Sequence, residues 1–202
     1  CAQHPRRGRP ARADPALDAG VGPGWRFDEA ATGQRFTRSE GLGVAGFRAF
    51  MAGAFSALVN DPFRVDAVAL ARVDAAMLAR WFQVGPDNPL VGLEGRAALL
   101  RRLAAAMLDE DGAFAGTPRP GALFDAVTKH GASRKIGAEA ILHALLGGLG
   151  SIWLTGNALD GVALGDAWRP PLAGGTGTTA GWVPFHKPWQ WLTYWLFDRF
   201  AW

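Results

Sequence analysis

Polar residues that lie within apolar sequence are the first candidates for chemistry in this chain. The stretches that contain them are Arg38-Ser39-Glu40, Asp87-Asn88, Glu94 to Arg96, Leu123-Phe124-Asp125, Gly165-Asp166-x-Trp168 and Pro184-Phe185-His186-Lys187. Taken singly, each side chain could form a structural hydrogen bond or a helix cap, because buried polar groups need partners. Taken together, they could line a pocket for a small polar ring compound, since tryptophan faces stack on flat rings while carboxylates and amides bind hydrogen-bonding edges.

Two glycine-containing motifs are typical of phosphate-binding loops but lack the strand that such loops follow. Gly41-Leu42-Gly43-Val44-Ala45-Gly46 matches the dinucleotide pattern G-x-G-x-x-G, yet residues 35–40 before it are mostly polar. We interpret these glycines as allowing close helix packing. Asp109-Glu110-Asp111-Gly112 with Gly116-Thr117 is faintly similar to a phosphoribosyl-diphosphate loop, but it follows a helical pattern, which favours a solvated helix end.

The histidines and the cysteine give no metal-binding or hydrolase motif. The chain has four histidines and one cysteine, and the histidines are widely spaced without an H-x-x-x-H pair. No serine elbow is present, so a serine hydrolase is not indicated. Among the histidines, His186 alone lies beside residues that could take part in catalysis or substrate binding. We therefore expect no metal site and no cofactor.

The elements that must position these residues are predicted to be mostly helical. Residues 22–36 are predicted to form a loop or short hairpin with a turn at Thr32-Gly33, and 162–164 a short extended piece. Asp66 is predicted to cap a helix. Helices are predicted over about 40–58, 66–82, 92–108, 121–130, 137–149 and 188–200. The sequence predicts an all-α or strongly α-dominated fold, with 17–202 as one incomplete multi-helix domain.

Charge and composition exclude several classes of protein. The formal charge of +3 comes from a Pro/Arg-rich segment over 1–16, and the rest of the chain is formally neutral. A nucleic-acid partner is therefore not expected, because its binding surface would be basic. No segment approaches about 18 unbroken apolar residues, and the aromatic stretch 182–202 lacks a basic face, so no membrane partner is expected. Residues 1–16 read as a disordered or non-native tail without a signal peptide, and we expect a cytoplasmic protein.

A series of collinear motifs resembles the uracil-catabolism protein family of fungi and bacteria, long catalogued as a domain of unknown function. The matching stretches are GWRF (24–27), Thr32-Gly33, RSEGL (38–42), GAFS (53–56), VDA (65–67), FQVGPDNPLVGLEGRAALL (82–100), RPG (119–121), LFD (123–125), LGDAW (164–168), VPFHK (183–187) and QWLT (190–193). The resemblance covers roughly residues 17–194, and so many motifs in one order make chance similarity a poor explanation.

The chain also departs from the family pattern. Pro188-Trp189 stands where the family has a leucine and a small hydroxyl residue, and Trp195 replaces a small polar residue. Sequence that family members carry before Leu17 and after the aromatic end has no counterpart here. We therefore expect a fragment that lacks both family ends, and any site that needs those ends would be incomplete.

The resemblance implies a role in pyrimidine degradation, in which the uracil ring is opened while attached to ribose. One reaction proposed for such a family is release of urea from a ribosyl-urea intermediate, a glycosidase-like hydrolysis. Breaking a ribosyl C–N bond develops positive charge on the sugar, which a carboxylate stabilises, while an acid protonates the departing nitrogen. The catalytic candidates are Asp166 or Asp125 as the carboxylate and His186 as the acid. The substrate-binding candidates are Arg38, Glu40, Asn88, Glu94, Trp168, Lys187 and Gln190.

Two other functions stay open at this point. A uracil phosphoribosyltransferase would fit the same pathway, although the weak loop over 109–117 and the lack of predicted strands disfavour it. A non-catalytic pathway scaffold would use the same polar residues only for structural hydrogen bonds. The expected partner is a small nucleoside-derived substrate.

Overall fold

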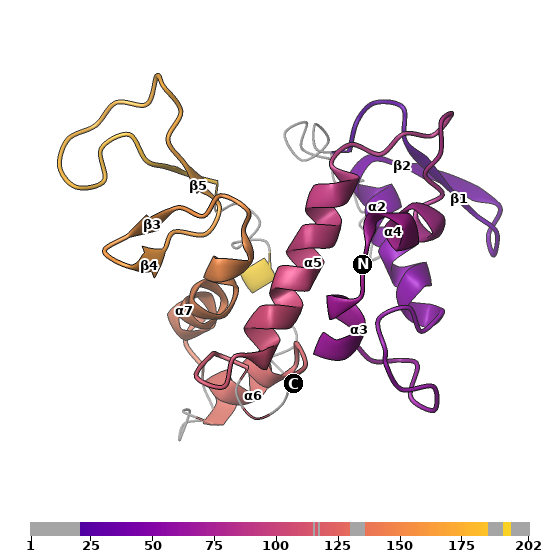
Figure 1. Cartoon of the computed structure of the whole chain (residues 1–202), viewed down its shortest axis with the longest axis horizontal. Helices are drawn as coiled ribbons and strands as arrows, with labels where there is room; N and C mark the ends of the chain where they lie inside the picture. Colours follow the sequence, from indigo (N-terminus) through magenta and orange to yellow (C-terminus); the bar gives the residue numbers. More distant parts are fainter. Residues whose placement is uncertain (1–20, 115, 117, 130–135, 186–191, 195–202) are drawn as a thin grey trace, which may run out of the picture. The chain divides into compact units, whose positions relative to one another are not determined.

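The computed structural model describes residues 21–114, 116, 118–129, 136–185 and 192–194. The elements in chain order are β1 (Arg26–Glu29), β2 (Gln34–Thr37), α2 (Arg38–Met51), α3 (Ala67–Ala71), α4 (Ala75–Trp81), α5 (Leu93–Leu108), α6 (Ala122–Lys129), α7 (Ala138–Leu149), the 3-10 turn η1 (Gly150–Ile152), β3 (Ala158–Leu159), β4 (Val162–Ala163), β5 (Ala167–Trp168) and β6 (Val183–Pro184) (Figure 1). The strands pair as antiparallel hairpins β1–β2, β3–β4 and β5–β6. This part of the chain is helix-rich, as predicted, but mixed rather than all-α.

Three of the six predicted helices form close to their expected bounds. The helices predicted over 92–108, 121–130 and 137–149 correspond to α5, α6 and α7. The hairpin with its turn at Thr32-Gly33 is confirmed by β1 and β2, and Gly33 has the positive φ of 68° that favours glycine. The first helix, α2, ends seven residues before its predicted end at 58, since Gly53 turns the chain with a φ of 75°. The helix predicted over 188–200 lies largely outside the described residues.

The single helix predicted over 66–82 is wrong, because two short helices form there. Asp66 caps α3, and its carboxylate accepts from the Ala69 N–H at 2.9 Å. Helix α3 ends at Ala71, with Arg72 as its C-cap residue, and α4 starts one residue after Asp74. The sequence carries the reason: RVDAVALA (64–71) is followed by RVDAAMLA (72–79), so the favourable N-cap residue Asp recurs eight residues later. The second cap motif competes with continuation of the first helix.

The described residues fall into two compact units. Unit 1 comprises 21–48 and 76–93, and unit 2 comprises 49–75 and the described residues from 94 onward. The core of unit 1 is centred on Trp25, which is 1% exposed and donates its indole N–H to the Phe82 carbonyl at 2.9 Å. A Cβ atom at Gly41 would lie 2.8 Å from the Trp25 ring, so this glycine lets α2 pack against the tryptophan. The packing interpretation of the glycine pattern therefore holds at Gly41 but not at Gly43 or Gly46, where a Cβ would meet nothing within 4 Å.

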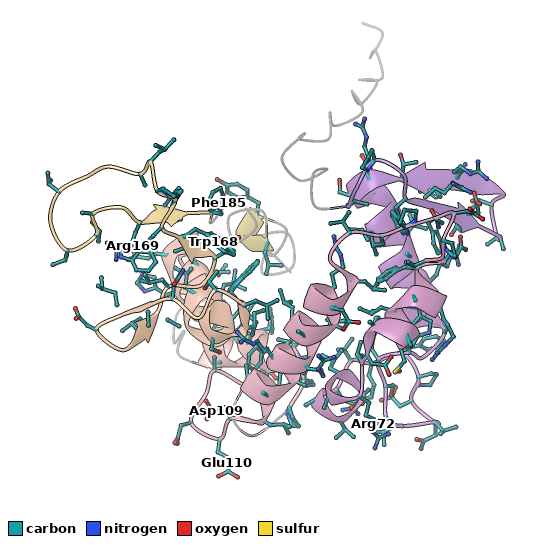
Figure 2. The ribbon with its side chains drawn as sticks, turned by 45° about the horizontal axis from the view of Figure 1, so that its top comes forward. Arg72, Asp109, Glu110, Trp168, Arg169 and Phe185 are labelled. Carbon is teal, nitrogen blue, oxygen red and sulfur yellow. The ribbon has the colours of Figure 1, made fainter. Side chains whose placement is uncertain are left out.

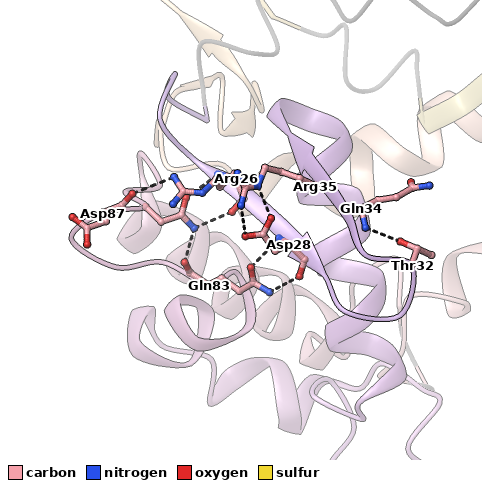
Figure 3. A network of polar contacts seen from close by, with 8 residues as sticks. Arg26, Asp28, Thr32, Gln34, Arg35, Gln83 and Asp87 are labelled. Carbon is pink, nitrogen blue, oxygen red and sulfur yellow. Dashed lines mark hydrogen bonds and ion pairs between the residues drawn. The ribbon is translucent and has the colours of Figure 1, made fainter.

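Two side-chain amides cover the free edge of β1 in unit 1. Gln83 pairs with both backbone groups of Asp28, accepting from its N–H and donating to its carbonyl, each at 2.9 Å (Figure 3). Asn88 does the same at Arg26, accepting from its N–H at 2.8 Å and donating to its carbonyl at 2.9 Å. Backbone groups at a strand edge need partners, and these amides provide them as a third strand would.

Two ion pairs fix the hairpin of unit 1. Asp28 and Arg35 are directly opposite in the register of β1 and β2, and the Arg35 guanidinium contacts both carboxylate oxygens, at 2.6 and 3.1 Å (Figure 3). Glu29 is buried and accepts from the Thr32 hydroxyl and from Arg48 of α2. These two donors hold the pKa of Glu29 below its ordinary value, so the carboxylate stays ionised in a buried place.

Unit 2 contains a helical core and the two shorter hairpins. Helix α7 packs closely against α6 and Phe114 at Gly148. A Cβ atom at this glycine would lie 3.1 Å from Leu123 of α6 and 3.5 Å from Phe114. Helix α5 turns Ala97, Ala104 and Met107 inward, and all three are buried. Arg102 of α5 donates to the backbone after η1, at the Trp153 carbonyl. Within the described residues, no helix combines the length and apolarity that crossing a membrane requires.

Candidate functional site

An open pocket of about 480 Å³ lies at the β5–β6 hairpin of unit 2. Its lining residues are Asp166, Trp168, Arg169, Pro170 and Phe185. Figure 2 labels three of them, Trp168, Arg169 and Phe185. The Trp168 and Phe185 side chains are 49% and 52% exposed, so their apolar surface is available to a ligand. The volume falls within the range of about 300–1,000 Å³ typical of small-molecule sites. The pocket thus combines an anionic group, a cationic group and two aromatic side chains.

The backbone around Asp166 is held by side chains of the preceding segment. The Thr155 hydroxyl donates to the Gly165 carbonyl at 2.9 Å, and the Asn157 amide donates to the Ala167 carbonyl at 2.7 Å. The Asp166 carbonyl accepts from the Phe185 N–H at 2.8 Å, which joins the start of β5 to the end of β6. Gly165 has a φ of 64°, a left-handed conformation that glycine adopts without strain. Asp166 is therefore placed by a fixed backbone.

The Asp166 carboxylate and the Trp168 indole are joined by a hydrogen bond. Trp168 Nε1 donates to Asp166 Oδ1 at 2.7 Å across the single residue between them. This bond fixes the orientation of both side chains. Within the described part of the chain, Asp166 Oδ2 has no hydrogen-bond partner, which leaves one carboxylate oxygen for a ligand or water.

Arg169 is a pocket residue that the sequence analysis did not identify. Its guanidinium lies over the Trp182 ring, 5.1 Å from the centroid, and donates to the Ala180 carbonyl at 3.2 Å. Both partners belong to the loop between β5 and β6, residues 169–182. The sequence signal for Arg169 was only its place directly after Trp168. The β5–β6 hairpin brings it to Trp182, thirteen residues later in the chain.

The second carboxylate candidate, Asp125, is engaged elsewhere in unit 2. It lies in the first turn of α6 and pairs with Arg119, whose guanidinium is 2.6 Å from Asp125 Oδ2. It is not among the residues that line the pocket at β5–β6. The structure therefore does not bring Asp125 to that pocket, and a catalytic role for it stays a prediction.

The remaining described candidates do not gather in one place. Arg38 and Glu40 are exposed in the first turn of α2, and Arg38 has a φ of 58°. Asn88, also in unit 1, uses its amide for the β1 edge and donates as well to the Gln83 carbonyl at 2.6 Å. Glu94 is exposed in the first turn of α5, in unit 2. Binding roles for these residues stay predictions, and the contacts of Asn88 favour a structural one.

Three predicted site residues, His186, Lys187 and Gln190, lie outside the described residues. The first two follow Phe185, a lining residue of the pocket, directly in the sequence. Their proposed roles as an acid and as phosphate or substrate ligands stay predictions. Among the described residues, no three His, Cys, Asp or Glu side chains form a group that could hold a metal ion. The acidic segment starting at Asp109 follows α5 rather than a strand, as expected for a helix end (Figure 2).

Comparison with known proteins places the chain in a family. The model of the family described as "Protein of unknown function (DUF1688)" matches residues 16–202. A protein of Lachancea kluyveri named "Uracil catabolism protein 4" is 36% identical over 188 residues, which is 88% of this chain and 43% of that protein. "Protein urg3" of Schizosaccharomyces pombe is 35% identical over 185 residues, 91% of this chain and 42% of that protein.

The chain thus spans less than half the length of these two curated relatives. No solved structure matches it. Because the family model covers nearly the whole chain, and two relatives above 30% identity cover most of it, the chain belongs to the DUF1688 family.

Proposed function

We propose that the chain acts in uracil catabolism, by contributing the site that cleaves the N-glycosidic bond of a ring-opened ribosyl-urea to release urea. The general role is supported by the name of the Lachancea kluyveri relative, which is 36% identical. The single observation that carries the reaction is the pocket in which Asp166 lies beside the aromatic side chains of Trp168 and Phe185. A carboxylate next to flat apolar surface suits a substrate that has a planar ureido group and a sugar.

The proposed reaction needs a group that responds to positive charge on the sugar. The C1′–N bond breaks with its electron pair moving to nitrogen, so the ribosyl carbon becomes electron-poor. Asp166 Oδ2 stabilises that charge and accepts a proton from the water that adds to C1′. The bond from Trp168 Nε1 to Oδ1 keeps the carboxylate in one orientation while this happens. The products are free ribose and urea.

The departing nitrogen needs a proton, for which His186 is the proposed donor. A histidine suits this role near neutral pH because its ordinary pKa lies close to that range. The proposal for His186 depends on its place directly after Phe185 in the sequence. With an acid on the nitrogen and a carboxylate at the sugar, bond cleavage and water addition balance in protons and electrons.

The experiment is a urea-release assay with ribosyl-urea in water enriched in ¹⁸O. It uses the 202-residue chain and, in parallel, the full-length Lachancea kluyveri relative, since the chain covers 43% of that protein. We expect urea together with ribose that carries ¹⁸O at C1′, because water attacks the sugar carbon. The anomeric oxygen also exchanges slowly with water, so the label is read at early time points against a ribose control. Absence of urea from both proteins would overturn the proposal.

The variant Trp168→Ala tests whether the pocket is the site. Removing the indole deletes the orienting hydrogen bond and one aromatic wall, so we expect kcat to fall about tenfold or more, with a higher KM. The matched control is Trp153→Phe, which changes a tryptophan of unit 2 that does not line the pocket. Equal losses in the two variants would assign the effect to folding and contradict the site.

A further inference from the structure

The guanidinium of Arg169 is a cation that the proposed reaction does not use. Among the described residues, Arg169 forms no ion pair, and its polar contacts are with the Ala180 carbonyl and the face of Trp182. Asp166 lines the same pocket, but its carboxylate is bound to the Trp168 indole instead. The pocket therefore presents separate anionic and cationic groups.

The contacts of Arg169 fix its guanidinium without using up its donors. A guanidinium has five N–H donors, and one of its terminal nitrogens, Nη2, donates to Ala180. Stacking on Trp182 restricts the plane of the group, so its remaining donors are held in a defined direction. A planar fork of this kind binds phosphate and carboxylate oxygens in a bidentate manner.

The loop that carries these partners is fixed by its own hydrogen bonds. The Gly181 N–H donates to the Gly174 carbonyl at 3.0 Å, and the Trp182 N–H donates to the Thr179 carbonyl at 3.1 Å. Gly181, with a φ of 78°, lies between Ala180 and Trp182, the two residues that contact Arg169. The cation is thus positioned before any ligand binds, which lowers the entropic cost of binding.

We infer that Arg169 binds the phosphate of a phosphorylated sugar, so that the substrate of this pocket is the phosphate ester of the ring-opened nucleoside rather than the free nucleoside. This inference rests on the proposed function. The phosphate lies at the Arg169 side, because the Asp166 carboxylate would repel it at the other. The aromatic side chains of Trp168 and Phe185 line the same pocket and offer flat apolar surface to the rest of the ligand. A volume of about 480 Å³ accommodates a pentose phosphate with a ureido group.

The first test measures binding without turnover, with ribose 5-phosphate and uncharged ribose as probes in isothermal titration. We expect the wild-type chain to bind ribose 5-phosphate at least tenfold more tightly than ribose. Arg169→Gln removes the charge and is expected to erase that preference. Arg169→Lys keeps the charge but loses the planar fork, so an intermediate preference is expected. Arg72→Gln is the matched control, since Arg72 lies at the C-terminus of α3 and does not line the pocket.

The outcomes separate this inference from the proposed function. Equal binding of the two probes by the wild type, or an Arg169→Gln variant that binds ribose 5-phosphate as tightly as the Arg72→Gln control, overturns the phosphate assignment. Tighter binding of a ureido carboxylate such as 3-ureidopropionate than of ribose 5-phosphate also overturns it. The urea assay, run with ribosyl-urea and its 5-phosphate, then reports on the reaction. Urea release from both at equal kcat/KM would leave the reaction standing and remove the role of Arg169.

The opposite result would be tighter binding of ribose 5-phosphate than of ribose, with no release of urea from either substrate. It would support Arg169 as the anion ligand and reject glycosidic cleavage. With both proposals correct, Arg169→Gln lowers kcat/KM for the phosphate ester at least tenfold. For free ribosyl-urea the same variant is expected to lose less kcat/KM than for the phosphate ester, because the free nucleoside has no phosphate for the guanidinium to bind.

Discussion

Replacement of Asn88 by alanine tests whether this residue is structural. The side chain makes three hydrogen bonds to backbone groups: it accepts from the Arg26 N–H at 2.8 Å and donates to the carbonyls of Arg26 and Gln83 at 2.9 and 2.6 Å. Asn88→Ala removes all three. The N–H and carbonyl of Arg26 at the edge of β1 then lose their partners, while Gln83 continues to pair with Asp28.

The expected cost follows from the number of bonds and their exposure. A hydrogen bond contributes roughly 1 kcal/mol net, so three bonds set an upper value of about 3 kcal/mol. Asn88 is half-buried, so water replaces part of the lost bonding and the expected loss is about 2 kcal/mol. Asn88→Asp is expected to cost at least as much, because it places a carboxylate oxygen against the carbonyls of Arg26 and Gln83.

The assay is urea denaturation of the chain followed by circular dichroism. The matched control is Asp87→Ala, because Asp87 is an exposed neighbour whose carbonyl, not its side chain, accepts from Arg26. We expect the control to change the free energy of unfolding by less than about 0.5 kcal/mol. An Asn88→Ala variant as stable as this control would refute the structural reasoning and return Asn88 to the substrate-binding candidates.

Two further predictions concern stability. Gly41→Ala should lower the free energy of unfolding by about 1–2 kcal/mol, because its Cβ would lie 2.8 Å from Trp25. Gly43→Ala should raise that free energy by about 0.5–1 kcal/mol, because a Cβ there meets nothing within 4 Å. Thermal melting of both variants tests this, and melting temperatures that shift in the same direction would contradict it. Acid should also destabilise the chain. The Thr32 and Arg48 donors lower the pKa of Glu29 from its ordinary value of 4.5. Their contribution to the free energy of unfolding is therefore present above that value and is lost as the pH falls below it. The urea midpoint should therefore fall on acidification from about pH 6 to pH 3, less steeply in Glu29→Gln, and an unchanged slope in that variant would oppose the assignment.

The pH dependence has a second contributor in Asp66. Burial of its carboxyl raises the pKa, but the N–H groups of Ala57 and Ala69 and the charge of Arg64 outweigh burial and lower it from 3.8. Its stabilising effect is therefore also present above its ordinary pKa and is lost on acidification. Because Asp66 caps α3, the loss at low pH includes the cap itself.

Local sequence signals predicted much of the fold. Helices α5, α6 and α7 have apolar periodicity and are bounded by glycine, proline or acidic segments, so their positions follow from local preference. The break between α3 and α4 required a comparison of two cap motifs rather than one apolar stripe. The pairing of Gln83 and Asn88 with β1 links residues more than fifty positions apart and has no local signal.

The candidate site was predictable only where its residues are close in sequence. Asp166 and Trp168 are two residues apart, and the short turn after Gly165 places both at one pocket. Arg169 depends on the β5–β6 pairing to reach Trp182, and that pairing involves two residues on each strand. Strands so short carry no alternation of apolar and polar residues from which they could be predicted.

Urea release by Asp166→Asn, compared with Asp125→Asn, tests the central claim most directly. Both substitutions remove one carboxylate from unit 2, but only Asp166 lines the pocket. We expect Asp166→Asn to lower kcat at least a hundredfold. Asp125→Asn weakens the pair with Arg119 and should lower thermal stability while leaving kcat within about threefold of the wild type. Full activity in a folded Asp166→Asn variant would contradict the catalytic role of Asp166, and loss of kcat in a folded Asp125→Asn variant would move that role to Asp125.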